Sequence, residues 1–177
     1  ALETVPCAEE VRAIVSLLPG LGRPAWISLA CRSGEELNDG GRIEEALAIV
    51  DAADPEGRAV CGVGVNCCSI DHVLPLVRRI LSHMRTGGVP RAVVAYPNTG
   101  EEWDAATKSW RSGTGCTDPE AFADRMCEVV DAARAFSSPA RGGGVKVRGL
   151  PVVVGGCCRT SPEFIAALRR KVDRRYM

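Results

Sequence analysis

Three cysteine side chains follow predicted strands and could together bind one metal ion. Cys67 comes directly after an apolar run at 59–66, and the adjacent Cys157 and Cys158 follow the run Val152–Val154. Because the carboxyl ends of parallel strands meet at one edge of a sheet, we expect the three thiols to share that edge. Thiolates are favoured ligands of Zn²⁺, and three protein ligands leave a fourth position open for a substrate. The spacing therefore indicates a candidate zinc site.

The two glycines before the cysteine pair, Gly155 and Gly156, bear on whether both thiols can reach one ion. Adjacent side chains of a regular strand point to opposite faces, whereas a glycine-rich turn lets the backbone redirect them. Two other interpretations stay open at this point. An adjacent pair of cysteines is often a packing feature. It can also be a dithiol redox site, although redox pairs usually have two intervening residues and a disulfide between neighbours is strained.

Short apolar runs alternate with amphipathic helical stretches along the whole chain, which is typical of an α/β fold with a parallel sheet. Strands are predicted at 25–31, 59–66, 92–96 and 152–154, after a strand remnant at 1–6. Helices are predicted at 7–18, 43–50, 73–84, 118–133 and from 160 onward. Pro19 and the glycines after it are expected to end the first helix. Asp118-Pro119-Glu120 is the clearest helix start, and 137–149 is predicted to be a mobile loop.

The composition limits the class of protein. The chain has 177 residues, with 22 basic and 22 acidic side chains, so its formal net charge is zero. This size and balance indicate one soluble domain, and no apolar run approaches the roughly 20 residues of a membrane span. A neutral chain lacks the basic field of a nucleic-acid binder, and the arginines at 169–175 are not interleaved with aromatic residues. The nine cysteines, an odd number, favour the reducing cytoplasm over a disulfide framework.

Three motifs occur in order and at suitable separations along the chain. They are Gly64-Val65-Asn66-Cys67, Tyr96-Pro97-Asn98-Thr99-Gly100-Glu101-Glu102-Trp103-Asp104 and Gly155-Gly156-Cys157-Cys158-Arg159-Thr160-Ser161-Pro162. Together they resemble the homocysteine S-methyltransferase family, and the second resembles its branch that uses S-methylmethionine or S-adenosylmethionine. Glu3-Thr4-Val5-Pro6 is similar to the family's segment after the fourth barrel strand. The resemblance covers nearly the whole chain.

The resemblance implies a fold, an activity and a set of site residues. The fold would be the C-terminal half of a TIM (β/α)8 barrel, so that residues 1–177 form a single but incomplete homocysteine-binding domain, from the end of strand four to helix eight. The activity would be zinc-dependent methyl transfer from a sulfonium donor to homocysteine, forming methionine. Cys67, Cys157 and Cys158 would be the zinc ligands and catalytic residues, and Glu3 would contact the homocysteine amino group.

The missing first half of the barrel leaves a second function open. The family's amino-terminal strands have no counterpart, and Asp39-Gly40-Gly41 lies after strand five rather than after strand one. The alternative is a catalytically inactive half-barrel that binds zinc or a partner chain. Open sheet edges would favour association with a complementary half-barrel or with further copies of the chain.

Other residues that could take part in chemistry have ordinary structural explanations. Four aromatic side chains could hold a sulfonium cation over a ring, although packing is the favoured role of each: Trp26, Tyr96, Trp103 and Trp110. Four further cysteines fit strand or helix interiors and are predicted to be structural: Cys31, Cys61, Cys68 and Cys127.

Overall fold

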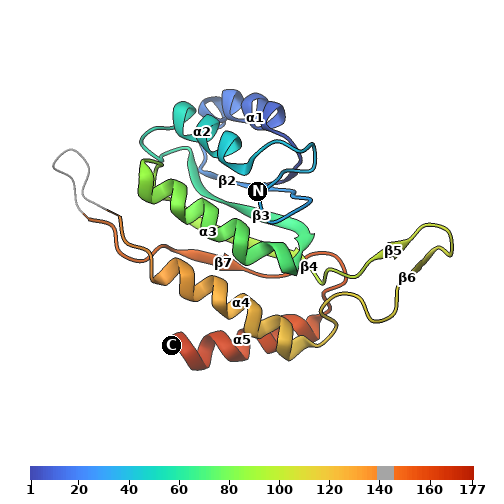
Figure 1. The fold of residues 1–177 in the computed structure, drawn as a ribbon. Helices are drawn as coiled ribbons and strands as arrows, with labels where there is room; N and C mark the ends of the chain where they lie inside the picture. Colours follow the sequence, from blue (N-terminus) through green and yellow to red (C-terminus); the bar gives the residue numbers. More distant parts are fainter. Residues whose placement is uncertain (139–145) are drawn as a thin grey trace.

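The computed structural model describes residues 1–138 and 146–177 and is built around a parallel sheet (Figure 1). The five strands are ordered as they occur along the chain: β1 (Leu2–Val5), β2 (Ala25–Leu29), β3 (Val60–Ser69), β4 (Ala92–Asn98) and β7 (Val152–Val154). The predicted parallel α/β fold is confirmed, and the first residues form a strand that pairs with β2. Parallel strands with sequential order place all their carboxyl ends at one edge, where a site can form.

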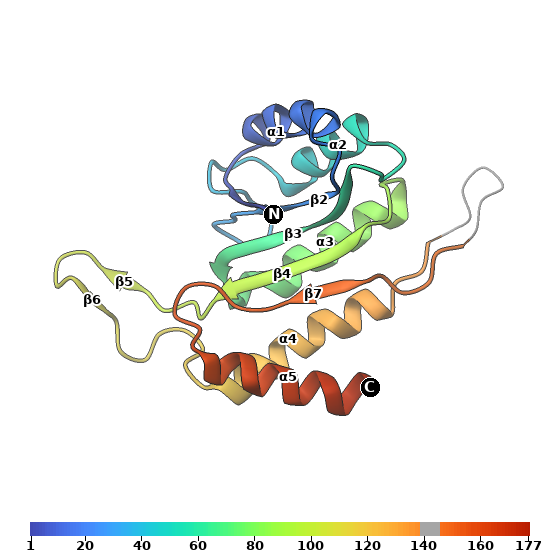
Figure 2. The ribbon, with the colours of Figure 1, turned by 180° about the vertical axis from the view of Figure 1, so that it is seen from behind.

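Helices follow the strands and lie on one side of the sheet. They are α1 (Ala8–Leu21), α2 (Ile43–Ala53), α3 (Ile70–Thr86), α4 (Pro119–Arg134) and α5 (Pro162–Tyr176). Seen from behind, β3 and β4 have no described helix in front of them, and α3 lies beyond the strands (Figure 2). This one-sided arrangement is that of a barrel segment, in which helices form the outer ring. Of the described helices, none is both long and apolar enough to span a bilayer.

Close approach of β3 and β4 fixes the centre of the sheet. Val93, Val94 and Ala95 of β4 are all buried. Gly64 lies opposite Val94, and a Cβ built on Gly64 would come within 1.7 Å of the Val94 carbonyl oxygen. Only glycine fits there. Glycine at position 64 therefore allows β3, the strand that leads to Cys67, to lie directly beside β4.

The helix ends agree with the predictions in one case and differ in another. Asp118 caps α4, since its carboxylate accepts hydrogen bonds from the backbone N–H groups of Glu120 and Ala121, both at 3.2 Å. The first helix was predicted to end at Pro19, Gly20 and Gly22: the end at Pro19 is wrong, because α1 continues to Leu21, and the end at Gly22 is confirmed. The chain leaves the helix at Gly22, whose left-handed φ of 59° terminates it.

Two loops extend from the body. The segment between β4 and α4 holds a hairpin of β5 (Trp103–Asp104) and β6 (Ser109–Trp110), which projects beyond the carboxyl edge of the sheet (Figures 1 and 2). The predicted mobile loop 137–149 lies largely outside the described residues, which omit 139–145. Its described ends are joined by a hydrogen bond from Ser138 N to Val147 O at 3.1 Å.

The arginine-rich last helix pairs with acidic residues of its neighbour α4. Arg170 bonds Glu120 at 2.8 Å, and Arg175 bonds Asp131 at 2.5 Å. These side chains are largely exposed, so each pair adds only a few tenths of a kcal/mol, up to about 1 kcal/mol. Arg170 and Arg175 of α5 are therefore engaged in contacts within the chain.

Candidate functional site at the carboxyl ends of the strands

The structure brings together the three cysteines that the sequence singled out. The Sγ atoms of Cys67, Cys157 and Cys158 all lie within 4.8 Å of one another. Cys67 and Cys157 are half-buried and Cys158 is exposed, so the cluster opens to solvent on one side. All nine cysteines of the chain are free thiols, which leaves these three available as ligands.

An irregularity in β3 aims Cys67 toward the cluster. The strand runs on to Ser69, further than predicted, but its pairing with β4 shifts register between Asn66 and Ser69. Cys67 there has a left-handed φ of 50°, which is unusual for a residue with a Cβ. The next residue, Cys68, is buried in the core. The local bend thus separates a structural cysteine from a candidate ligand beside it.

A tight turn after β7 positions the other two thiols. The backbone N–H of Cys157 donates to the Pro97 carbonyl at 2.7 Å, and the Cys157 carbonyl accepts from the Thr160 hydroxyl at 2.6 Å. A Cβ on Gly156 would lie 2.3 Å from that hydroxyl oxygen, so a side chain at Gly156 would disrupt the turn. The glycine motif therefore allows both adjacent cysteines to approach Cys67, which a regular strand would prevent.

The neighbouring thiols disfavour ionisation of Cys67. The pKa of Cys67 is raised to about 12, first by burial, and the hydrogen bond with Cys157 and the charges of Cys157 and Cys158 contribute in the same direction. Two or three neighbouring thiolates are costly without a compensating positive charge. A divalent cation supplies that charge, and it favours the deprotonated form of each ligand.

Glu3 lies at the same end of the sheet as the thiols. Burial raises the pKa of Tyr96, and the neighbouring Glu3 carboxylate contributes to the rise. The Tyr96 hydroxyl accepts a hydrogen bond from Trp26 Nε1 at 3.3 Å. Tyr96 is paired in register with Asn66, the residue before Cys67, so Glu3 lies beside a residue of the strand ends that carry the cluster. Glu3 is exposed, which leaves its carboxylate accessible to a ligand.

Asn66 joins three strands below the site, a role that sequence reasoning missed. It is 1% exposed. Its Oδ1 accepts from the Thr4 backbone N–H at 2.8 Å and from the Ser28 hydroxyl at 2.7 Å, and its Nδ2 donates to the Thr4 hydroxyl at 2.8 Å. The available signal was a polar residue inside a buried apolar strand, because such a group needs partners.

Glu101 and Arg159 form a second contact that the sequence could not reveal. Arg159 Nε and Nη2 each donate to a different oxygen of Glu101 at 3.0 Å. This bonding with Arg159 holds the pKa of Glu101 below its usual value, against the effect of burial. The residues are 58 positions apart, so no local pattern connects them. Arg159 also lies over the Trp110 ring, 5.1 Å from its centroid.

The remaining candidates have structural surroundings. Cys31, Cys68 and Cys127 are buried, as predicted. Cys61 was wrongly expected to be buried: it is exposed near the start of β3, although Val63 and Val65, at alternate positions on the same face, are buried. Its thiol donates to the Ala25 carbonyl at 3.3 Å. Of the four aromatic candidates, Trp26 and Tyr96 bond one another, Trp110 has a cation over its ring, and the side chain of Trp103 lies outside the described part.

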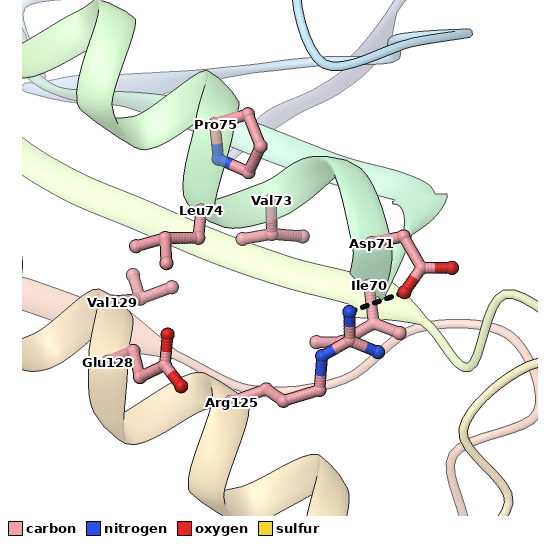
Figure 3. A pocket seen from close by; sticks show the side chains of 8 residues that line it. All are labelled: Ile70, Asp71, Val73, Leu74, Pro75, Arg125, Glu128 and Val129. Atoms are coloured by element: carbon pink, nitrogen blue, oxygen red, sulfur yellow. Dashed lines mark hydrogen bonds and ion pairs between the residues drawn. The ribbon is translucent and has the colours of Figure 1, made fainter.

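A small cavity between α3 and α4 is separate from the thiols. Figure 3 shows Arg125 of α4 extending to Asp71 at the start of α3, with Leu74 and Val129 deeper in the space between the helices. Its volume is about 140 Å³ and its lining includes no cysteine. Small-molecule sites usually occupy about 300–1,000 Å³, so this space is a packing gap beside an ion pair.

Comparison with known proteins decides the family. The family model described as homocysteine S-methyltransferase matches residues 1–172. The chain belongs to the homocysteine S-methyltransferase family. The resemblance inferred from the three sequence motifs is thereby confirmed.

Individual members of the homocysteine S-methyltransferase family match over nearly the whole chain. Homocysteine S-methyltransferase YbgG of Bacillus subtilis is 31% identical over 166 residues, which cover 93% of this chain and 44% of that protein. Homocysteine S-methyltransferase of Escherichia coli is 31% identical over 172 residues, covering 97% and 46%. The metallated form of the E. coli homocysteine methyltransferase MmuM superposes with a TM-score of 0.62 at 25% identity, covering 96% of this chain and 43% of that one. The chain thus spans about half the length of these relatives.

Proposed function

We propose that this chain carries the thiol site of a homocysteine S-methyltransferase that transfers a methyl group from a sulfonium donor, S-methylmethionine or S-adenosylmethionine, to homocysteine. The product is methionine, which places the reaction in methionine biosynthesis. The observation that carries the proposal is the cluster of Cys67, Cys157 and Cys158, with all Sγ atoms within 4.8 Å. Family membership supports homocysteine as the substrate, since the matching relatives are named for homocysteine.

The donor set fits zinc. A tetrahedral ion with Zn–S bonds of about 2.3 Å holds its sulfurs about 3.8 Å apart, so thiols already within 4.8 Å need only small movements. Three cysteines are three ligands, which leaves a fourth position open on the solvent side, where Cys158 is exposed. Bound there, zinc would lower the pKa of the homocysteine thiol so that the thiolate is present at neutral pH.

Side chains around the cluster would orient the substrate. The Glu3 carboxylate is accessible and would attract the homocysteine ammonium group, while Asn66 fixes the backbone of the adjacent Thr4. The homocysteine sulfur, having lost its proton to solvent, attacks the methyl carbon of the donor. The donor's C–S bond breaks, and its electron pair remains on the donor sulfur as a neutral thioether. Charge is cancelled in this step, so excluding water from the site favours it.

The domain itself is proposed to be incomplete as it stands. Residues 1–177 would form a single homocysteine-binding domain that corresponds to the barrel from the end of strand four to helix eight. The outer strands β1 and β7 would then pair with the strands of the other barrel half. Val153 of β7 and Ile165 of α5 are 45% and 42% exposed, which supports an apolar contact on that side. The nine free thiols support a cytoplasmic location.

The half-length match also favours a second candidate, a half-barrel without activity that binds zinc or a partner chain. One experiment separates the two functions. Purified protein is assayed for bound zinc and for methionine formation from homocysteine with each sulfonium donor, alone and together with the amino-terminal half of a relative.

If the chain is part of an active enzyme, the purified protein should bind one equivalent of zinc. It should also form methionine, at least when the complementary half is present. Zinc without turnover in either mixture would favour the inactive half-barrel. A second experiment replaces Cys67 by serine. Its matched control is Cys61→Ser, because both cysteines lie on β3 and Cys61 is exposed away from the cluster. Only the change at Cys67 should abolish zinc binding; equal loss in both variants would contradict the proposal.

A further inference from the structure

The two ends of the candidate site are held by the last two residues of β4. Asn98 Nδ2 donates to the Cys67 carbonyl at 3.4 Å, and the Pro97 carbonyl accepts from the Cys157 N–H at 2.7 Å. Both bonds act on the backbone next to a candidate ligand. Pro97 and Asn98 therefore connect the thiol of β3 with the turn after β7.

Cys158 is held differently. Among the described residues, no backbone hydrogen bond engages its own N–H or carbonyl, although the preceding Cys157 carbonyl accepts from the Thr160 N–H at 3.2 Å, and its side chain is exposed. The next residue, Arg159, has a left-handed φ of 69°, a conformation that a residue with a Cβ adopts only when its surroundings favour it. Cys158 and Arg159 are the middle residues of the turn that the bond between Cys157 and Thr160 closes, so the position of the Cys158 thiol depends on the turn and on what holds Arg159.

The Arg159 side chain is fixed by contacts from two other segments. Its guanidinium forms two parallel bonds with Glu101, each 3.0 Å long, and lies 5.1 Å from the centroid of the Trp110 ring. The side chain of Glu101 is only 10% exposed. The fully buried Thr99 orients that carboxylate, since its hydroxyl donates to Glu101 Oε2 at 2.8 Å. A bidentate pair to a pre-oriented, largely buried carboxylate fixes direction as well as charge.

We infer that the Glu101–Arg159 pair is a positioning device that keeps the Cys158 thiol directed toward Cys67 and Cys157. The inference rests on the proposed function insofar as it concerns metal affinity, but it makes a separate statement about Cys158 in the metal-free protein. Neither Glu101 nor Arg159 acts as a ligand here. They act through the backbone that connects Arg159 to Cys158.

The test compares Glu101→Gln and Arg159→Lys with the unaltered full chain. Glu101→Gln removes the charge of the acceptor, and Arg159→Lys keeps the positive charge but loses the two-pronged geometry. Glu102→Gln is the matched control, because Glu102 adjoins Glu101 and forms a 3.0 Å ion pair with Arg111 in which both side chains are about 60% exposed. Circular dichroism establishes that each variant is folded.

The first readout needs no metal. Metal-free protein is treated with iodoacetamide, and the alkylation rates of Cys157 and Cys158 are followed by mass spectrometry of peptides. Glu101→Gln should raise the rate at Cys158 severalfold relative to Cys157, and Arg159→Lys should have a smaller effect in the same direction. An unchanged ratio in both variants, or an equal change in Glu102→Gln, would overturn the inference.

The second readout is Zn²⁺ affinity, measured by competition with a chromophoric chelator, together with the visible spectrum of the Co²⁺-substituted protein. Loss of an orienting partner typically weakens metal binding by about 10–100-fold, so we expect at least about a tenfold loss in Glu101→Gln and a changed Co²⁺ spectrum. Affinity equal to that of Glu102→Gln would contradict the inference. If the unaltered chain itself binds no zinc, the proposed function fails, and the alkylation result still decides the role of the pair.

Discussion

Asn66 and Thr4 are 62 residues apart and are joined by two hydrogen bonds, each 2.8 Å long. One runs from the Thr4 N–H to the Asn66 side-chain oxygen, and the other runs from the Asn66 amide to the Thr4 hydroxyl. Thr4 has a φ of 62°, which is rare for a β-branched residue. Asn66 therefore stabilises the unusual backbone beside Glu3 and immediately precedes Cys67. It connects the proposed substrate contact with the thiol cluster.

Replacing Asn66 by alanine should destabilise the protein. Asn66→Ala leaves the buried Ser28 hydroxyl and the Thr4 groups without their partner, which typically costs about 1–3 kcal/mol. Urea denaturation would measure the loss in the free energy of unfolding. Ser28→Ala removes only one of these bonds and should cost less. Equal stability of Asn66→Ala and the unaltered chain would contradict the structural role given to Asn66.

Glycine at position 64 should be indispensable. A Cβ at Gly64 would lie 1.7 Å from the Val94 carbonyl oxygen, and a backbone atom in a central strand cannot easily move away. Gly64→Ala should therefore cost about 3 kcal/mol or prevent folding. The control is Gly20→Ala in α1, where nothing lies within 4 Å and alanine should stabilise by about 0.5–1 kcal/mol. Thermal unfolding of both variants checks this, and similar effects in the two would be contrary to expectation.

Asp54 should make stability depend on acid pH. Burial raises the pKa of Asp54, but hydrogen bonds from the Val60 backbone, the Arg91 guanidinium and the Arg58 and Ala59 backbones outweigh it and hold that pKa below its usual value. A carboxylate with a lowered pKa in the folded state stabilises fully above its unfolded pKa of about 3.9, and its contribution is lost as pH falls toward the folded pKa.

Asp54→Asn should thus lower the free energy of unfolding at pH 7 by about 2 kcal/mol, a typical value for charged hydrogen bonds, and flatten its fall below about pH 4. Urea denaturation across the range of pH 3 to 7 measures both effects. Glu102→Gln, with its exposed carboxylate, serves as control and should change little. A pH profile for Asp54→Asn that runs parallel to that of the unaltered chain would refute this account.

The edge at β7 should mediate association. Val153→Lys places a charge on the exposed side of this strand, and lysine at a sheet edge opposes pairing. We expect the unaltered chain to self-associate in analytical ultracentrifugation and Val153→Lys to shift it toward monomer. Leu17→Lys, at a 68% exposed position of α1, should leave the distribution unchanged. A chain that is monomeric at every concentration would argue against an apolar contact at this edge.

Local patterns in the sequence predicted the helices and strands. They also predicted that the three cysteines of the candidate site lie together, because each follows the end of a strand. Asp118-Pro119 predicted the start of α4 because a cap and a proline act over one turn. The end of the first helix at Pro19 was predicted wrongly, because a proline removes only one hydrogen bond of the helix. The helix α1 ends instead at Gly22, which has a left-handed conformation. Burial of Cys61 was predicted wrongly because a place in a strand does not decide whether its first residues are covered, and Val63 and Val65 on the same face are buried.

Long-range polar contacts lay beyond sequence reasoning. Asn66 could have been noticed as a polar residue in an apolar strand, but its partners Thr4 and Ser28 are identified only by the register of the sheet. Nothing local connects Glu101 with Arg159. Their pairing depends on how the loop after β4 meets the turn after β7.

X-ray absorption at the zinc edge tests the central claim most directly. The protein loaded with one equivalent of zinc should show three sulfur neighbours at about 2.3 Å and one lighter ligand, which a sulfur atom should replace when homocysteine is added. Cys67→Ser should reduce the sulfur count, and Cys61→Ser should not. A spectrum of nitrogen and oxygen neighbours alone, or one unchanged by Cys67→Ser, would contradict a zinc site at Cys67, Cys157 and Cys158.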